Sequence, residues 1–209
     1  MAGCCSGCHP PTNDAGPRFR KALWVALAIN AGMFLVEIVA GVAAGSSSLQ
    51  ADALDFLGDA ANYGVSLFVL GMTLRHRAMA SVLKGATMGA FGLWVIGNTT
   101  LHLLSDTVPE ASVMGAVGVA ALVANMVVAV MLYAFRDGDS NMRSVWICSR
   151  NDAIGNLAVL AAASGVFATG SGWPDFAVAG IMAVLALSGA AQVLRHALAE
   201  LRSPPLAAA

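Results

Sequence analysis

The stretch SLQADALDFLGDAANY, residues 48–63, places three aspartates inside a segment that is otherwise apolar enough for a membrane-spanning helix. An Asp at the centre of such a helix costs about 2.5 to 3.5 kcal/mol, whereas a Leu or Ile contributes about 0.3 to 0.6 kcal/mol. The cost is tolerated where the acid faces a bundle interior, water or a cation. On a helix, Asp52, Asp55 and Asp59 lie within about 60° of one another. The stretch therefore predicts one acidic stripe directed into a helical bundle.

The rest of the chain has the composition of a membrane protein. Its 209 residues are 58% hydrophobic and 11% charged. A helix needs about 20 mostly apolar residues to cross a bilayer, and six stretches qualify: 21–44, 47–71, 81–104, 112–134, 144–168 and 174–195. We therefore expect an all-α integral membrane protein with six transmembrane helices. A cleaved signal peptide is the competing interpretation of the first stretch, which is longer than an h-region of about 7–15 residues and carries Glu37.

The positions of the basic residues predict the orientation. All eleven Lys and Arg residues lie before the first stretch, around the second and fourth connections, or at the carboxyl end. The positive-inside bias then places both termini in the cytoplasm. We expect a cytoplasmic Cys-rich tail over 1–20, a transport domain over 21–195 and a short cytoplasmic tail over 196–209. The expected location is the cell membrane, taken as a bacterial inner membrane, and no nucleic-acid partner is expected.

The fifth stretch contains a counterpart of the acidic stripe, CSRNDAIGN, residues 148–156. Cys148 and Asp152 are four residues apart and share a helix face, and Asn156 extends that face by one turn. The second and fifth helices run in opposite senses, as in an inverted repeat that meets at the bilayer midplane. Asp55 and Asp59 would then join Cys148 and Asp152 in one four-coordinate metal site.

The ligand types indicate which cation such a site would hold. A thiolate with carboxylates in a tetrahedron suits zinc, and the sulfur also accepts cadmium. Magnesium prefers octahedra of oxygen ligands, so Cys148 argues against it. Several buried carboxyl groups and a thiol cannot all ionise together, so the empty site holds protons that an arriving metal must displace. Coupling between metal and protons is therefore expected from the ligand set.

These motifs resemble the cation diffusion facilitator, or cation efflux, family of metal/proton antiporters. The resemblance covers about residues 18–195 and rests on the run NAGMFLVEIVAGVAAGSSSLQADALDFLGDA (30–60) and on the ligand pair of the fifth stretch. It implies a transport site with two positions on span two and two on span five, which here are Asp55, Asp59, Cys148 and Asp152. Members usually carry His or Asp where Cys148 stands. The resemblance also implies a homodimer, with zinc or cadmium as transported substrate and no cofactor.

Two usual features of the family do not occur in this sequence, namely the cytoplasmic carboxyl-terminal domain and a histidine-rich loop between spans four and five. The amino end, MAGCCSGCHPP, offers another place to capture metal through Cys4, Cys5, Cys8 and His9. On the cytoplasmic side a Cys cluster more often binds metal than forms disulfides. The alternatives are an unstructured tail with incidental thiols and a c-type haem attachment motif, which the orientation opposes.

Other buried polar residues have two interpretations each. Asp52 is either an auxiliary acceptor or proton carrier, or a hydrogen-bonding partner of a neighbouring helix. Glu37 and Asn30, on one face of the first helix, either line the path or hold helices together. Asn156 either supports Asp152, as metal ligands usually require, or makes an ordinary interhelical hydrogen bond.

The hypothesis that follows is zinc or cadmium efflux by proton antiport and alternating access. One alternative is a membrane-embedded metal sensor or chaperone that binds with the same ligands and transports nothing. An intramembrane metallohydrolase needs an open coordination position and a general base. Four protein ligands close that position, and the sequence carries no H-E-x-x-H, so we do not expect an enzyme.

Overall fold

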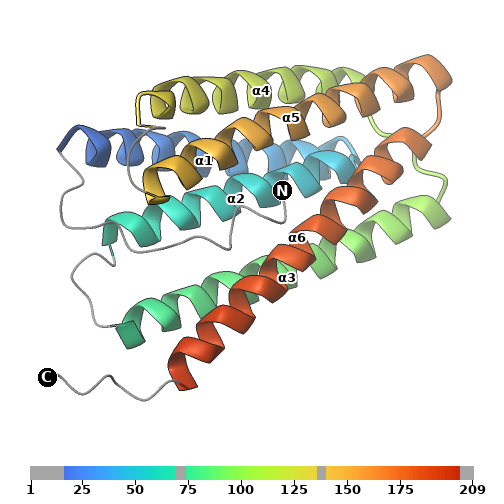
Figure 1. Ribbon diagram of the computed structural model, residues 1–209. Coiled ribbons are helices and arrows are strands. Elements are labelled where there is room, and N and C mark those ends of the chain that lie inside the picture. Colours follow the sequence, from blue (N-terminus) through green and yellow to red (C-terminus); the bar gives the residue numbers. More distant parts are fainter. Residues whose placement is uncertain (1–16, 69–73, 136–139, 203–209) are drawn as a thin grey trace, which may run out of the picture.

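The computed structural model describes residues 17–68, 74–135 and 140–202. These residues form six helices and no strand (Figure 1): α1 Pro17–Ala43, α2 Ser47–Phe68, α3 Leu74–Leu104, α4 Ala111–Tyr133, α5 Ser140–Thr169 and α6 Trp173–Arg202. The all-helical fold class expected from the sequence is confirmed. The cysteine cluster Cys4, Cys5, Cys8 and His9 lies outside the described residues.

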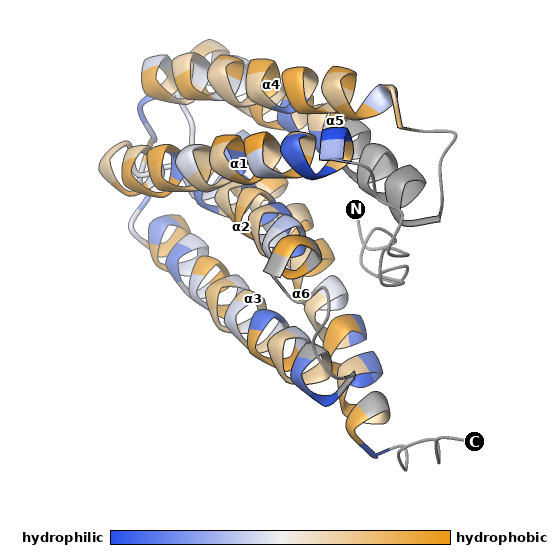
Figure 2. Cartoon of the chain, turned by 90° about the vertical axis from the view of Figure 1, so that its left-hand side faces the viewer, coloured by the Kyte–Doolittle hydropathy of each residue, from blue (hydrophilic) through white to orange (hydrophobic). Residues whose placement is uncertain are grey.

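Successive helices run in opposite directions and pack as three pairs, α1 with α2, α4 with α5, and α3 with α6. The start of α1 and the end of α6 lie at one end of the bundle, here called the terminal end (Figure 1). The connections 44–46, 105–110 and 170–172 lie at the other, here called the connection end. Figures 1 and 2 show the α3–α6 pair diverging from the other four helices towards the terminal end.

The distribution of polarity is that of a protein in lipid. Figure 2 shows hydrophobic residues along almost the whole of α4. Large apolar side chains are exposed on the outer faces, including Leu35, Val39, Leu83, Val130 and Phe167. Acidic and amide side chains are buried instead, among them Glu37, Asp52, Asp59, Asn125 and Asp152. In water this arrangement would be unfavourable, whereas in a bilayer it places apolar surface against lipid and polar groups against protein.

Five helical segments in the described part of the chain are long and apolar enough to cross a membrane: Pro17–Ala43, Ala78–Leu104, Ala111–Tyr133, Asp152–Thr169 and Trp173–Ala199. The helix outside this set is α2, whose three aspartates and Gln50 lower its hydropathy. It is nevertheless central, because every residue from 46 to 54 is buried. Since α2 contacts helices on several sides, α1, α3, α5 and α6, its acids meet protein rather than lipid.

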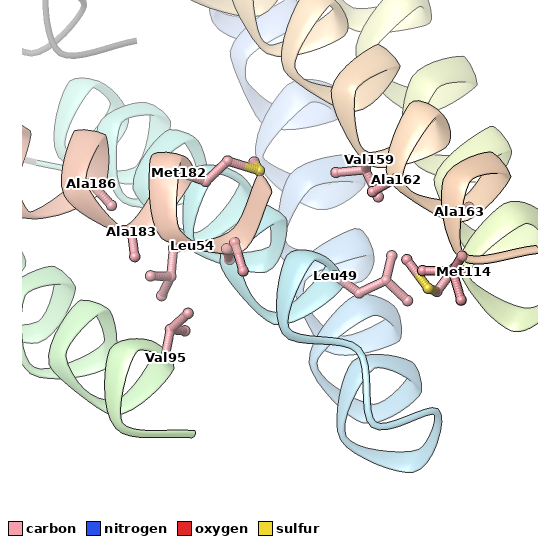
Figure 3. Packing of buried hydrophobic residues seen from close by; sticks show 13 residues of the cluster. Leu49, Leu54, Val95, Met114, Val159, Ala162, Ala163, Met182, Ala183 and Ala186 are labelled. Atoms are coloured by element: carbon pink, nitrogen blue, oxygen red, sulfur yellow. The ribbon is translucent and has the colours of Figure 1, made fainter. Parts of the chain in front are cut away.

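Two apolar clusters fix the position of α2. The larger one joins it to α3, α4, α5 and α6 (Figure 3), with buried members that include Leu49, Leu54, Val95, Met114, Val159, Met182 and Ala183. The other lies between α1, α2 and α4 and consists of Phe19, Ala22, Leu23, Ala26, Tyr63, Leu67, Val128 and Leu132. Together they hold the polar middle of α2 facing the bundle interior.

Glycine allows the α3–α6 pair to pack closely. A Cβ atom on Gly85 would lie 2.9 Å from Cγ of Leu194, and one on Gly92 would lie 2.9 Å from Cδ2 of Leu187. Both distances are too short for a real side-chain contact, so Gly at these positions lets the two helices approach. This contact makes α3 and α6 one packing unit.

At the connection end, Asp175 of α6 holds the first turn of α2. Its Oδ1 accepts hydrogen bonds from the hydroxyls of Ser46 (2.7 Å) and Ser48 (2.6 Å) and from the backbone N–H of Ser48 (3.0 Å). Its Oδ2 accepts from the backbone N–H of Ser47 at 2.7 Å. The first N–H groups of a helix have no intrahelical partner, and an anion there is favoured by the helix dipole. Asp175 therefore caps α2 from another helix.

His102 belongs to the same end of the bundle. Its Nδ1 lies 3.3 Å from the Ser47 hydroxyl, within hydrogen-bonding distance. Gln50 donates from Nε2 to the carbonyl of Gly41 at 3.2 Å and accepts from Asn98 Nδ2 at 2.6 Å, which joins α1, α2 and α3. The connection end is thus held by polar contacts that bring several helices together around the start of α2.

Candidate metal site

The acids of α2 and α5 meet inside the bundle. Asp59 of α2 and Asp152 of α5 are each 8% exposed and lie on two helices that contact each other, and their carboxyl groups interact. Two neighbouring carboxylates repel each other and have only acceptors, so such a pair favours a shared proton or a bound cation. The two acids thus lie on helices that pack against each other.

Tyr63 contributes a contact that the sequence interpretation missed. Its hydroxyl donates a 2.8 Å hydrogen bond to Oδ2 of Asp59, and the side chain is 1% exposed. The spacing of four residues from Asp59 places both on one face of α2 and is the signal that was available. A hydroxyl in this position orients the carboxyl group and uses one of its lone pairs.

Lys84 of α3 approaches the same carboxyl group from another helix. Its ammonium group attracts Asp59 and donates a hydrogen bond to Oδ1 of Asn62, one turn further along α2. From the sequence alone, Lys84 was interpreted only as one of the basic residues that indicate the orientation of the helices in the membrane. Its proximity to Asp59 depends on the packing of α3 against α2, which local spacing does not reveal.

A second group of acids lies closer to the connection end. The carboxyl groups of Glu37 on α1 and Asp52 on α2 are buried side by side and interact, and Asp55 acts electrostatically on Glu37. Asp55 is half-buried. The acidic stripe of α2 thus faces α1 near Asp52 and faces α5 near Asp59.

Asn156, one turn after Asp152 on α5, is fully buried. Neither its Oδ1 nor its Nδ2 has a hydrogen-bonding partner among the described residues. Asn30 of α1 donates from Nδ2 to the carbonyl of Ala26 at 2.8 Å, within its own helix. One of the two interpretations of Asn156 was an ordinary interhelical hydrogen bond. The described contacts contain no such bond for its amide.

The described residues include the side chains of only some of the four expected ligands. Among the described residues, no three His, Cys, Asp or Glu side chains are grouped closely enough to hold a metal ion. Cys148 belongs to α5 by the bounds of that helix, but its side chain lies outside the described residues. The ligand set Asp55, Asp59, Cys148 and Asp152 therefore stays a prediction.

Comparison with known families agrees with this architecture. The family model described as the cation efflux transmembrane domain matches residues 23–202. The chain belongs to the cation efflux family. The match takes in most of α1 and all of α2 to α6, so it includes both acidic helices. No curated protein matches the sequence.

Membership of the cation efflux family fixes the general activity. The chain is a multi-pass membrane protein that transports metal cations, and the family is one of transporters rather than enzymes. The resemblance stated from the sequence is confirmed. Within this cation efflux domain, the buried acids of α1, α2 and α5 are the groups whose chemistry fits a cation.

Proposed function

We propose that this chain exports zinc, and also cadmium, by exchanging the metal for protons at a site formed by Asp55, Asp59, Cys148 and Asp152. The observation that carries the proposal is the burial of Asp59 on α2 and Asp152 on α5, two helices that contact each other. Two acids from different helices, each nine-tenths buried, are costly in the bundle unless they share a proton or bind a cation.

The exchange follows from the chemistry of this pair. In the metal-free site, two neighbouring buried carboxyl groups resist ionising together, so the pair holds a proton. A dication binds best to ionised carboxylates and to a thiolate, so metal entry displaces the proton and the thiol hydrogen of Cys148. When the site faces a compartment where protons are available, protonation weakens the ligands and the metal leaves. Metal and protons therefore occupy the same groups in alternation.

The selectivity of the proposed site comes from Cys148. Soft thiolate beside hard carboxylates suits zinc and cadmium and disfavours magnesium, which prefers six oxygen ligands. Asp52 and Glu37 would support the site as neighbouring acids, and Asn156 would hold Asp152 or a water near the metal. Cys4, Cys5, Cys8 and His9 would collect metal at the cytoplasmic face before it enters the bundle.

The proposal also covers the location, orientation and oligomeric state of the protein. We place both termini in the cytoplasm of a bacterium, with the bundle in the inner membrane, on the basic residues that flank the helices. A homodimer is proposed as the working unit from the family resemblance alone. Protons and divalent metal ions are the exchanged partners, and the metal is substrate rather than a resident cofactor.

Zinc flux into proteoliposomes with an interior pH dye tests the proposal. Parent transporters oriented to pump into the vesicles should load zinc and shift the interior pH, whereas Asp59→Ala should abolish both signals. Cys148→His should retain zinc transport and weaken cadmium transport, because imidazole is a harder ligand than thiolate. Glu110→Ala, an exposed acid outside the site, is the control. Saturable zinc binding without any flux would support a sensor instead, and unchanged flux in Asp59→Ala would remove the proposed site.

A further inference from the structure

Lys84 is a cation placed beside a proposed metal ligand. It lies on α3, is half-buried, and donates its hydrogen bond to Asn62 of α2. Asn62 and Asp59 are three residues apart and share a face of that helix. The Lys84 ammonium and the Asp59 carboxyl group attract each other across the α2–α3 contact. The exchange mechanism proposed for the site gives the positive charge of Lys84 no role.

The contact between α2 and α3 fixes the position of Lys84. Nearer the connection end, Asn98 of α3 donates to Gln50 of α2 at 2.6 Å. Between that bond and Lys84, a Cβ on Gly58 would lie 3.1 Å from Cε of Met88, so the two helices are in close contact there. The three contacts follow the helices in opposite directions, as antiparallel packing requires. Lys84 is therefore held against α2 by the packing of the whole helix.

An ammonium group here has opposite effects on the empty and the loaded site. In the empty site it offsets the charge that Asp59 carries in a medium of low dielectric constant. In the loaded site it stands beside a dication, and like charges repel. The same side chain therefore stabilises the metal-free state and destabilises the metal-bound state.

We propose that Lys84 is a tethered counter-cation, a positioning and affinity-setting residue whose ammonium group takes part of the place of the metal charge at Asp59 when no metal is bound. The inference rests on the proposed function, since it assumes that Asp59 binds the transported cation. Lys84 competes with the metal and keeps zinc affinity low enough for release.

The position of Lys84 on α3 links this competition to movement. α3 packs against α6 as a unit, through Gly85 and Gly92, whereas Asp59 belongs to the group formed by α1, α2, α4 and α5. Repulsion between the bound dication and the ammonium group acts between these two units. Metal binding therefore weakens the α2–α3 contact near Lys84, and metal release restores it.

The test compares variants that separate charge from hydrogen bonding. Lys84→Gln removes the charge and keeps an amide donor for Asn62, and Lys84→Arg keeps the charge. Asn62→Ala removes the hydrogen bond and leaves Lys84 charged. Lys21→Gln, an exposed residue of α1, controls for loss of a positive charge elsewhere. Each protein is purified in detergent, its zinc affinity is measured by competition with a fluorescent chelator, and its flux kinetics are measured in proteoliposomes.

Lys84→Gln should bind zinc at least about tenfold more tightly than the parent, because the repulsion between a nearby ammonium group and the dication is lost. Its KM should fall and its kcat should fall with it, because release becomes slower. Lys84→Arg and Lys21→Gln should match the parent. If Lys84→Gln does not fold, Lys84→Met carries the same expectation with a side chain of similar length.

Three results would overturn the inference: an affinity of the charge-free variant within twofold of the parent, weaker binding by that variant, or tightening by Asn62→Ala to the same extent. The last result would assign the effect to the hydrogen bond. A parent that binds and moves zinc, together with an inactive Asp59→Ala, keeps the proposed function whatever Lys84 does. A parent that binds no zinc removes both proposals.

Discussion

Replacement of Asp175 should weaken the bundle more than any surface change. Hydrogen bonds to a charged group contribute about 1.5–3 kcal/mol each, and the Asp175 carboxylate accepts four from Ser46, Ser47 and Ser48. Their simple sum is a ceiling. The hydroxyls of Ser46 and Ser48 lie 3.4 Å apart and can bond to each other once the carboxylate is gone.

The backbone N–H groups of Ser47 and Ser48 are harder to satisfy, because they are the first donors of α2 and the surrounding residues 46–54 are buried. We therefore expect Asp175→Ala to lower the free energy of unfolding by about 3–5 kcal/mol. Asp175→Asn should lie between Asp175→Ala and the parent, since an amide keeps one acceptor oxygen and turns an N–H group towards a donor.

The assay is unfolding in mixed micelles of mild detergent and dodecyl sulfate, followed by circular dichroism. Glu110→Ala is the matched control, an acid at the same end that is exposed and whose carboxylate accepts a hydrogen bond from the Ser112 hydroxyl at 2.9 Å. It should change the free energy of unfolding by less than about 0.5 kcal/mol. An Asp175→Ala protein within about 1 kcal/mol of the parent would refute the capping argument.

Three further outcomes are expected. Gly172→Ala should destabilise the protein by about 3 kcal/mol, because a Cβ there would collide with the carbonyl oxygen of Thr107, whereas Gly180→Ala, with nothing within 4 Å, should be neutral or stabilising in the same unfolding assay. Equal effects of the two substitutions would refute this packing argument. Tyr63→Phe should weaken zinc binding about tenfold, through loss of the hydrogen bond that orients Asp59, and an unchanged affinity in the chelator assay would exclude that role. Zinc binding to the parent should release protons and weaken on acidification, by about tenfold per pH unit for each proton displaced; calorimetry in buffers of different ionisation enthalpy measures this, and an affinity independent of pH would contradict the exchange.

The helices could be predicted from the sequence because apolar length and the positions of basic residues determine them locally. Their ends could not. α3 begins at Leu74 rather than near 81, and α6 continues to Arg202 rather than ending near 195. Hydropathy marks where contact with lipid ends, whereas the backbone hydrogen bonds of a helix continue through charged residues outside the lipid.

The candidate site, too, could be proposed from the sequence only in part. Asp59 and Asp152 could be assigned in advance to helices that face each other, because spacing on a helix and the opposite directions of spans two and five are properties of the sequence. Tyr63, at i+4 from Asp59, gave a signal that the interpretation did not use. Lys84 and Asp175 act on residues of other helices, so their roles depend on how α3 and α6 pack. No local spacing predicts such contacts.

The central claim is that side chains of α2 and α5 together bind one dication. X-ray absorption spectroscopy of the zinc-loaded protein tests this claim most directly. The protein should carry Ser in place of Cys4, Cys5 and Cys8, so that Cys148 supplies the remaining thiol. The account predicts one sulfur ligand at about 2.3 Å and three oxygen ligands at about 2.0–2.2 Å. Loss of the sulfur signal in Cys148→Ser should complete the assignment. A zinc environment without sulfur, or one that Asp59→Ala and Asp152→Ala leave unaltered, would contradict it.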